Sequence, residues 1–204
     1  MQDYSTPPAE ISQVSDLDLT ATYSYAHYLK WTFDERIELI KGKVFTMSPG
    51  PARMHQKISR EISFVLHSFL KNKKCEVYTA PFDVRFPKKS LADEDIFTVV
   101  QPDLCVICDK HKLDERGCIG APDIVVEILS PGNNKKELKN KFEVYEESGV
   151  KEYWIVSPEN QTLLQNVRNE AGKFQASRLQ TLGDTVTTPI LPGFALNLDE
   201  VFAE

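Results

Sequence analysis

The sequence predicts one domain of mixed α and β structure, of the α+β or α/β class, built on a mixed central sheet. Three short apolar segments, at residues 99–107, 123–129 and 152–156, have the composition of buried strands. Two longer segments, 54–71 and 135–148, have apolar residues at helical spacing. Together with a strand expected at 76–86, they give the order helix, strand, strand, strand, helix, strand, which is an αβββαβ core.

The composition is that of an ordinary globular protein. The chain has 204 residues, of which 41% are hydrophobic and 26% charged, enough for a sizeable core. No apolar run reaches membrane-spanning length, and the polar start has no basic or apolar signal region, so we expect a cytoplasmic protein without a membrane partner. The formal net charge of −6 argues against an extended nucleic-acid-binding surface but not against a few local phosphate contacts.

The first forty-seven residues predict a tail, a short helix and a hairpin. Residues 1–20 are polar and rich in Ser, Thr, Pro and Asp, which predicts a flexible tail before a single domain at 21–204. A short helix is expected at 23–31, with Thr22 or Ser24 as its cap. Alternating residues around Lys41 and Gly42 predict a β-hairpin at 36–47.

The core elements follow in order. The apolar positions of the helix at 54–71 are Ile58, Ile62, Val65, Leu66, Phe69 and Leu70. The strand at 76–86 is interrupted at Pro81, and the apolar strands at 99–107 and 123–129 come next. The helix at 135–148 ends at Gly149, and the strand at 152–156 completes the core. Strands at 162–167 and 173–182 and a short helix at 198–202 are expected as C-terminal additions.

Four cysteines allow two interpretations. Cys105 and Cys108, with His111 and Cys118, have a loose version of the spacing of zinc ligands. Cys105, however, falls inside an apolar strand, where cysteine behaves as a small hydrophobic residue, and residues three apart in a strand point to opposite faces. We therefore favour reduced cysteines in a cytoplasmic protein.

Two isolated acids mark a candidate site. Asp103 and Glu127 lie in consecutive apolar strands, where an unpaired carboxylate is costly. Hard oxygen ligands on adjacent strands suit Mg²⁺ or Mn²⁺, and such an ion polarises a phosphodiester. Asp103 and Asp123 each follow a proline at the start of a strand, so each is either a ligand or the cap of a turn. A lysine near the ion would stabilise developing negative charge.

Several stretches resemble the Uma-type family of restriction-endonuclease-like proteins, a bacterial group with the PD-(D/E)XK nuclease fold. The resemblance covers roughly residues 23 to 202. It rests on Arg36-Ile-Glu-Leu-Ile-Lys-Gly-Lys-Val, Met47-Ser-Pro with His55, Val100-Gln-Pro-Asp-Leu, residues 120–131, residues 141–145, residues 149–158 and Leu191-Pro-Gly-Phe. It implies the restriction-endonuclease-like αβββαβ core, with the N-terminal hairpin and the C-terminal strands added.

The resemblance also implies residue roles. The metal-binding acids fall on Asp103 and Glu127. In this superfamily a lysine follows the second acid at one residue's spacing, but position 129 is Leu, and the resemblance places the lysine on the next helix at Lys141. Lys139 is the alternative. The residues expected to support the ligands or to contact phosphate are His55, Gln101, Glu38, Lys139 and Tyr145.

The expected function is hydrolysis of DNA phosphodiester bonds by an endonuclease dependent on Mg²⁺ or Mn²⁺. The leucine at position 129 and the acidic balance leave an alternative, a catalytically weak or inactive protein that keeps the nuclease scaffold and binds nucleic acid or a protein partner. Restriction-like nucleases often pair subunits to cut two strands, so a homodimer is expected by analogy.

Overall fold

The computed structural model describes residues 11–47, 52–131 and 135–203. Its α-helices are α1 (Tyr25–Tyr28), α2 (Arg53–Leu70), α3 (Lys135–Ser148) and α4 (Leu198–Phe202), and short 3-10 helices lie at Val14–Asp16, Asp93–Asp95 and Lys110–Lys112. Its strands are β1 (Ile37–Ile40), β2 (Lys43–Thr46), β3 (Glu76–Thr79), β4 (Val84–Arg85), β5 (Val99–Val100), β6 (Leu104–Ile107), β7 (Leu113–Asp114), β8 (Gly117–Ile119), β9 (Ile124–Ile128), β10 (Glu152–Ser157), β11 (Thr162–Arg168), β12 (Phe174–Ala176), β13 (Thr185–Val186) and β14 (Leu196–Asn197).

A mixed central sheet carries the core, in the order β12-β11-β10-β9-β6-β3. Strands β9 and β10 are parallel, and the other neighbours in this sheet are antiparallel. The sequence of elements α2, β3, β6, β9, α3, β10 is the αβββαβ core that the apolar patterns predicted. Both the fold class and the mixed sheet are therefore confirmed.

Helices α2 and α3 cover opposite faces of this sheet, because successive apolar side chains of its strands point to alternate faces. On one face, Val126 of β9 belongs to the same core cluster as Ile58 and Ile62 of α2. On the other face, Val125 packs in a second cluster with Tyr145 of α3. Since successive residues of a strand point to opposite faces, β9 is buried on both sides, as its continuous apolar run indicated.

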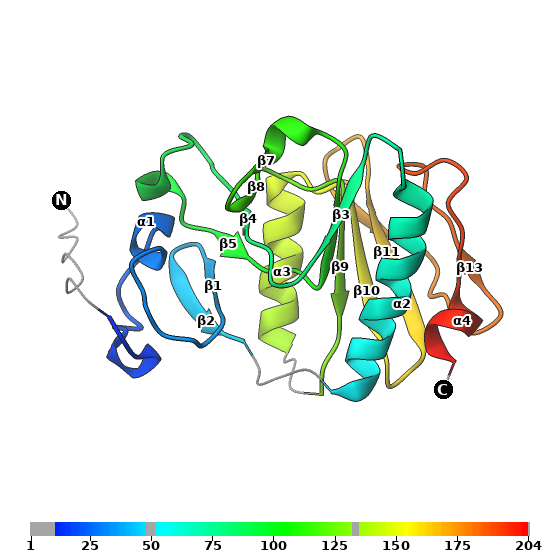
Figure 1. Ribbon diagram of the computed structural model, residues 1–204, viewed down its shortest axis with the longest axis horizontal. Coiled ribbons are helices and arrows are strands. Elements are labelled where there is room, and N and C mark those ends of the chain that lie inside the picture. Colours follow the sequence, from blue (N-terminus) through cyan, green and yellow to red (C-terminus); the bar gives the residue numbers. More distant parts are fainter. Residues whose placement is uncertain (1–10, 48–51, 132–134, 204) are drawn as a thin grey trace.

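A second sheet, in the order β2-β1-β5-β4-β8-β7, packs against the far side of α3. Ile40 of β1 and Val84 of β4 join the cluster that holds Tyr145, so α3 lies between the two sheets (Figure 1). The predicted hairpin is present as β1 and β2. Lys41 and Gly42 turn it with φ angles of 53° and 79°, as a two-residue hairpin loop requires.

The prediction of one continuous strand at 99–107 is wrong, because this segment forms two strands. Its first part, β5, belongs to the second sheet, and its second part, β6, belongs to the central sheet. Pro102 lies between them, and a proline has no N–H to donate to a ladder. The strand predicted at 76–86 divides in the same way at Pro81, where an interruption was expected. The polar joining segment forms the hairpin of β7 and β8, which the sequence did not predict.

The N-terminal part of the chain packs further than predicted. Residues 1–10 of the expected tail lie outside the described residues, but Ile11 and Leu17 are buried against β1 and β5 in a third core cluster. The short helix spans Tyr25–Tyr28 rather than 23–31, and Ser24 precedes it, as one of the two predicted caps. The packed part of the chain therefore includes residues before the predicted boundary at 21.

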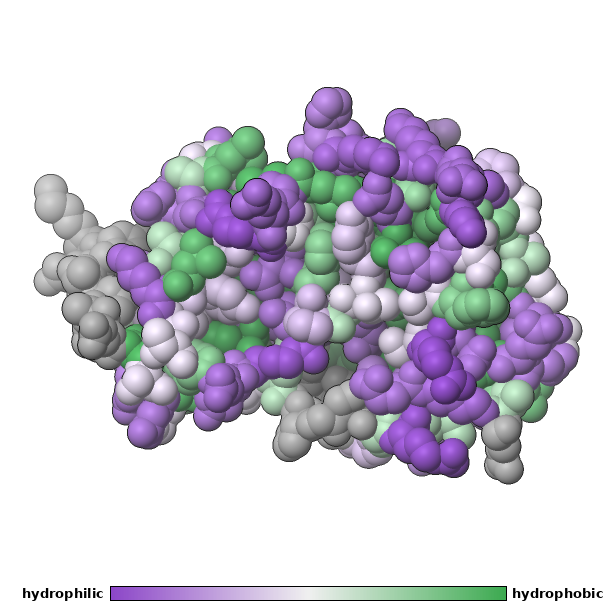
Figure 2. Space-filling model, in the orientation of Figure 1, coloured by the Kyte–Doolittle hydropathy of each residue, from purple (hydrophilic) through white to green (hydrophobic). Residues whose placement is uncertain are grey.

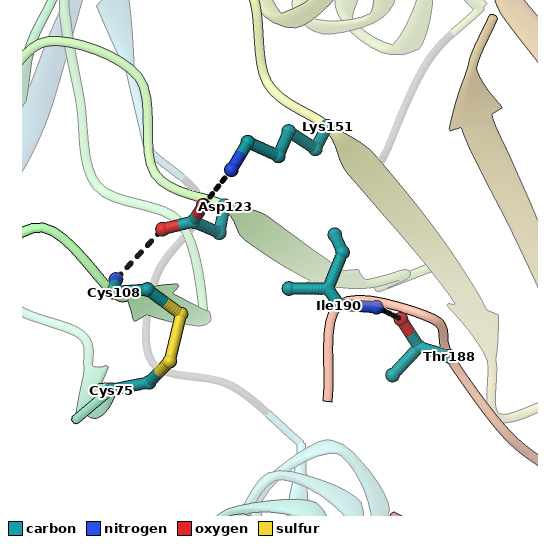
Figure 3. The surroundings of a disulfide bond; sticks show 6 residues. All are labelled: Cys75, Cys108, Asp123, Lys151, Thr188 and Ile190. Carbon is teal, nitrogen blue, oxygen red and sulfur yellow. Dashed lines mark hydrogen bonds and ion pairs between the residues drawn. A yellow bond between two sulfur atoms is a disulfide. The ribbon is translucent and has the colours of Figure 1, made fainter. Parts of the chain in front are cut away.

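The prediction of reduced cysteines is wrong for two of the four. Cys75 and Cys108 form a disulfide, because β3 and β6 pair with Glu76 opposite Ile107 and so bring the two flanking cysteines together. Figure 3 shows this bond beside Asp123, whose carboxylate accepts from the Cys108 N–H at 2.7 Å and from Lys151 Nζ at 2.6 Å. Cys105 and Cys118 are free and buried, so these cysteines do not gather as zinc ligands.

The surface is mixed in character. On the face seen in Figure 2, hydrophilic residues are spread widely and interrupt the patches of apolar ones. Among the described residues, no helix is long and apolar enough to cross a membrane.

Candidate functional site

The pairing of β6 with β9 brings the two predicted acids together. The register places Leu104 opposite Val126, and continuing it by one residue places Asp103 opposite Glu127. Directly opposite residues of an antiparallel pair share a face, with Cβ atoms roughly 5 Å apart. Asp103 is fixed by two further bonds: its carbonyl accepts from the Ala80 N–H at 3.0 Å, and its Oδ2 accepts from the Ile128 N–H at 2.7 Å.

Helix α3 delivers Lys141 to Glu127. Lys141 Nζ lies 2.9 Å from Glu127 Oε1 and 3.1 Å from Glu38 Oε1, and its side chain is only 6% exposed. Tyr145, one turn further along α3, donates its hydroxyl to the same Glu127 oxygen at 2.6 Å. Glu38 reaches this cluster from β1 of the second sheet, so α3 links carboxylates of both sheets through one ammonium group.

Burial dominates the electrostatics of this cluster. Loss of water raises the pKa of Glu127 to about 7; the Lys141 charge opposes this shift, and the Asp103 and Glu38 charges add to it. Burial alone would lower the pKa of Lys141, but the two glutamates outweigh it and raise that pKa, so the ammonium group stays charged. Tyr145 has its pKa raised by burial and by Glu127, so it remains a hydroxyl donor.

His55 lies in the first turn of α2 and contacts Asp103. Its Nε2 is 3.3 Å from Asp103 Oδ2, and the residue is 8% exposed. Burial lowers the pKa of His55, but the hydrogen bond and charge of Asp103, with smaller contributions from Ile128 and Glu127, more than offset this, so the net shift is upward. Within the described part of the chain, its buried Nδ1 has no hydrogen-bond partner.

Among the described residues, the side chains of Gln101 and Lys139 form no hydrogen bond or ion pair with Asp103, Glu127 or Lys141; they bind other residues. The Gln101 N–H donates to Glu38 Oε1 at 2.9 Å, whereas its side-chain oxygen accepts from Arg36 at 2.9 and 3.0 Å, away from this cluster. Lys139 is 74% exposed and lies 3.8 Å from Glu143 on the surface of α3. Of the two lysines considered from the sequence, Lys141 is the one that contacts Glu127.

A family model decides the relationship of the chain. The model, described as "Putative restriction endonuclease" and named Uma2, matches residues 25–199. The chain belongs to the Uma2 family. The resemblance inferred from the sequence motifs is thereby confirmed.

Two other proteins are similar to this Uma2 chain. An uncharacterized protein of Synechocystis sp., slr1290, is 26% identical over 133 residues, which are 64% of this chain and 66% of that protein. The solved structure of a nuclease described as putative and as belonging to DUF820, from Anabaena variabilis, superposes with a TM-score of 0.67 at 21% identity. It covers 88% of this chain and 97% of that one, and at this identity it shows a shared fold.

Sequence reasoning assigned no role to two residues that contact predicted ones, Tyr153 beside Tyr145 and Arg36 beside Gln101. Tyr153 of β10 is fully buried, and its pKa is raised by burial and by the Glu127 charge. Its hydroxyl has no partner among the described residues. Arg36, just before β1, holds the side chain of Gln101. Tyr153 lies in an apolar strand, where the sequence gives no sign of a functional residue. Arg36 could have been suspected only from Glu38, the acidic residue two positions later in β1.

The donors of the site limit the metal it could hold. The described residues contain no group of three or more His, Cys, Asp or Glu side chains suited to an ion. Asp103 and Glu127 form a pair of carboxylates, and Mg²⁺ is usually held by one or two carboxylates while keeping several waters. The contacts that described residues make with the Glu127 carboxylate fall on Oε1. The pair therefore fits Mg²⁺ or Mn²⁺ in donor type and number, with water completing the coordination.

Proposed function

We propose that this protein is a metal-dependent endonuclease that hydrolyses phosphodiester bonds of DNA. Family membership and fold support a nuclease in general. The observation that carries the finer proposal is the cluster of Asp103, Glu127 and Lys141. Two acids stand opposite each other at the end of the central sheet, and an ammonium group lies 2.9 Å from one of them.

The three residues would divide the chemistry as follows. Asp103 and Glu127 would hold Mg²⁺ or Mn²⁺, which when bound neutralises phosphate charge and makes a bound water more acidic. Lys141 would stabilise the negative charge that develops on the phosphate oxygens. Its raised pKa keeps it protonated at neutral pH, so it serves as a fixed positive charge rather than as a base.

The surrounding residues would hold these groups in place. Glu38 and Tyr145 orient Lys141 and Glu127 by the contacts described above. His55 would orient Asp103 through the 3.3 Å contact, and Gln101 would act only through its backbone N–H on Glu38. Lys139 is not assigned a role, because it is exposed on the far flank of α3.

Cleavage assays test this proposal. Supercoiled plasmid and single-stranded DNA would be incubated with wild type in Mg²⁺ and in Mn²⁺, beside Glu127→Gln, Lys141→Met and the control Lys139→Met. We expect cleavage by wild type and the control, and a loss of at least a hundredfold in the other two variants, as is typical when a charge-stabilising group is removed. Equal rates in wild type and Glu127→Gln would reject the proposed roles.

A second candidate function is binding without catalysis. Position 129 is Leu, and the Lys141 charge already partly balances Glu127, which also fits a scaffold that has lost its activity. Calorimetric titration with Mn²⁺ separates the two. Binding that disappears in Asp103→Ala supports the enzyme, whereas absence of binding in a folded wild-type protein favours the scaffold.

Two further expectations belong to this proposal. A homodimer would let two sites act on two DNA strands, and sedimentation at micromolar concentration would reveal it as a species of twice the monomer mass. A cytoplasmic location also remains a proposal, and the disulfide Cys75–Cys108 bears on it, because cytoplasmic proteins rarely keep disulfides. Thiol labelling of the protein in rapidly quenched cells would measure the fraction that is oxidised.

A further inference from the structure

A cavity of about 470 Å³ opens beside the candidate site. Its walls come from α1, from the connection between β3 and β4, and from the turn between β7 and β8, which surround β4 in Figure 1. Two of its lining segments touch the site directly. The connection donates the Ala80 N–H to the carbonyl of Asp103 at 3.0 Å, and lining residue Gln101 donates its N–H to Glu38 at 2.9 Å.

Aromatic rings form much of the cavity wall. Tyr78 and Phe82 lie parallel, with ring centroids 4.3 Å apart and an interplanar angle of 13°. Tyr28 lines the cavity as well and stacks on Tyr25 at 5.5 Å. The three lining aromatics are half-buried, so they border an open space instead of being sealed in the core. Such a wall favours a flat, aromatic ligand.

The charges of the cavity disfavour a phosphate and suit an uncharged ring. Asp83, Asp114 and Glu115 line it, against one cation, Arg116. Asp114 is paired with the buried Arg85 at 2.5 Å, and Arg116 is paired with Asp93 at 2.6 Å. Two lining acids, Asp83 and Glu115, therefore remain without an ion pair among the described residues. A nucleobase carries no charge at neutral pH, and its amino and imino N–H groups are donors of the kind a carboxylate accepts.

The cavity is preformed. The Cys118 N–H donates to the carbonyl of Asp83 at 2.8 Å, and Gly117 approaches the same segment closely enough that a Cβ on it would lie 2.3 Å from the Asp83 carbonyl oxygen. The Asp83 carboxylate is held by Gln101 at 2.8 Å and by Tyr25 at 3.2 Å. A ligand would therefore meet fixed walls and a fixed acceptor, which lowers the entropic cost of binding.

We propose that this cavity takes an unpaired nucleobase of the nucleic acid held at Asp103 and Glu127. The proposal rests on the proposed function and narrows its substrate. A base inside a duplex is stacked and paired and cannot enter a side pocket unless it is extruded. The preferred substrate is therefore single-stranded DNA, or duplex DNA opened by a mismatch, flap or end, rather than continuous duplex.

Fluorescence of 2-aminopurine tests the pocket without relying on cleavage. A short single-stranded oligonucleotide with one central 2-aminopurine would be titrated with wild type, Phe82→Leu, Phe82→Tyr and Phe64→Leu, in Ca²⁺, and each sample would then be checked for cleavage by gel. Phe64 is the matched control, because it is 66% exposed on α2 and lines a different groove. The same titration with a continuous duplex of the same sequence gives the preference for unpaired bases.

We expect quenching with wild type, and a Kd raised about tenfold in Phe82→Leu, as the loss of one stacked base predicts. Phe82→Tyr, which keeps the ring, and Phe64→Leu should bind like wild type. Equal affinity of Phe82→Leu and wild type, equal affinity for single strand and duplex, or no binding of the single strand would each overturn the pocket. Cleavage in the Mg²⁺ or Mn²⁺ assays that persists in those cases leaves the proposed nuclease standing. Base binding in Ca²⁺ by a wild-type protein that cleaves no DNA in Mg²⁺ or Mn²⁺ rejects the nuclease and keeps the pocket.

Discussion

The substitution Lys141→Met tests the buried cluster most directly. Methionine fills a similar volume but removes the ammonium group that lies 2.9 Å from Glu127 and 3.1 Å from Glu38. The side chains of all three are no more than 10% exposed, so two carboxylates would remain with little access to water. Removing one partner of a buried ion pair costs about 3–5 kcal/mol, and we expect a loss of this size in the free energy of unfolding at pH 7.

The raised pKa of Glu127 also predicts that the stability of the protein falls as pH rises. Burial raises the pKa of Glu127 from 4.5 to about 7 in the folded protein, so the folded state binds more protons than the unfolded state between these values. Stability from this group is present at low pH and is lost as pH rises to about 7. Without Lys141 the pKa of Glu127 rises further, and the loss continues above pH 7 at up to about 1.4 kcal/mol per pH unit.

Urea denaturation at pH 5, 7 and 9 measures these effects, with fluorescence of the buried Trp154 as the signal. Lys139→Met is the matched control, because it removes the same group from an exposed position of the same helix and should change stability by less than about 0.5 kcal/mol. The double variant Lys141→Met/Glu127→Gln should recover part of the loss, since one uncompensated charge is gone. A loss below about 1 kcal/mol that is the same at all three pH values would show that Lys141 is solvated and the cluster is misassigned.

Three further outcomes are expected. Tyr145→Phe should cost about 1.5–3 kcal/mol in urea denaturation, because it removes a 2.6 Å hydrogen bond to the buried Glu127 carboxylate; a change below 0.5 kcal/mol would contradict that bond. Reducing the disulfide between β3 and β6, which joins residues 33 apart in sequence, should lower stability by about 2–4 kcal/mol, and an unchanged midpoint with complete thiol labelling would refute this. Gly117→Ala should lower the thermal midpoint more than Gly120→Ala, since both have positive φ but only the first would place a Cβ 2.3 Å from the Asp83 carbonyl; equal shifts would count against the close approach.

Local patterns predicted the elements whose signals are local. The apolar run of β9 and the helical spacing of Ile58, Ile62 and Leu66 depend on burial within one element, and the hairpin depends on the positive φ angles at Lys41 and Gly42. These features are fixed by a few adjacent residues. Most of the core order therefore followed from the sequence.

Features that depend on pairing between distant segments could not be predicted from the sequence. The division of 99–107 between two sheets depends on which partners β5 and β6 find, since both halves are equally apolar. The disulfide depends on the register of β3 against β6. Glu38 was expected to support the ligands or to contact phosphate, but its contact with Lys141 depends on how α3 packs between the sheets. In each case the deciding contact is long-range.

The position of the lysine follows from the same packing. Helix α3 connects the parallel strands β9 and β10, so it begins at the end of the sheet where β9 finishes and runs back across the face that carries Glu127. Six residues into the helix, Lys141 has risen about 9 Å and stands over Glu127, at 2.9 Å. Leu129 lies beyond the end of β9 and instead pairs its N–H with Val156. The proposed role of Lys141 requires an amine at contact distance from Glu127, and the crossover helix places one there although position 129 is Leu.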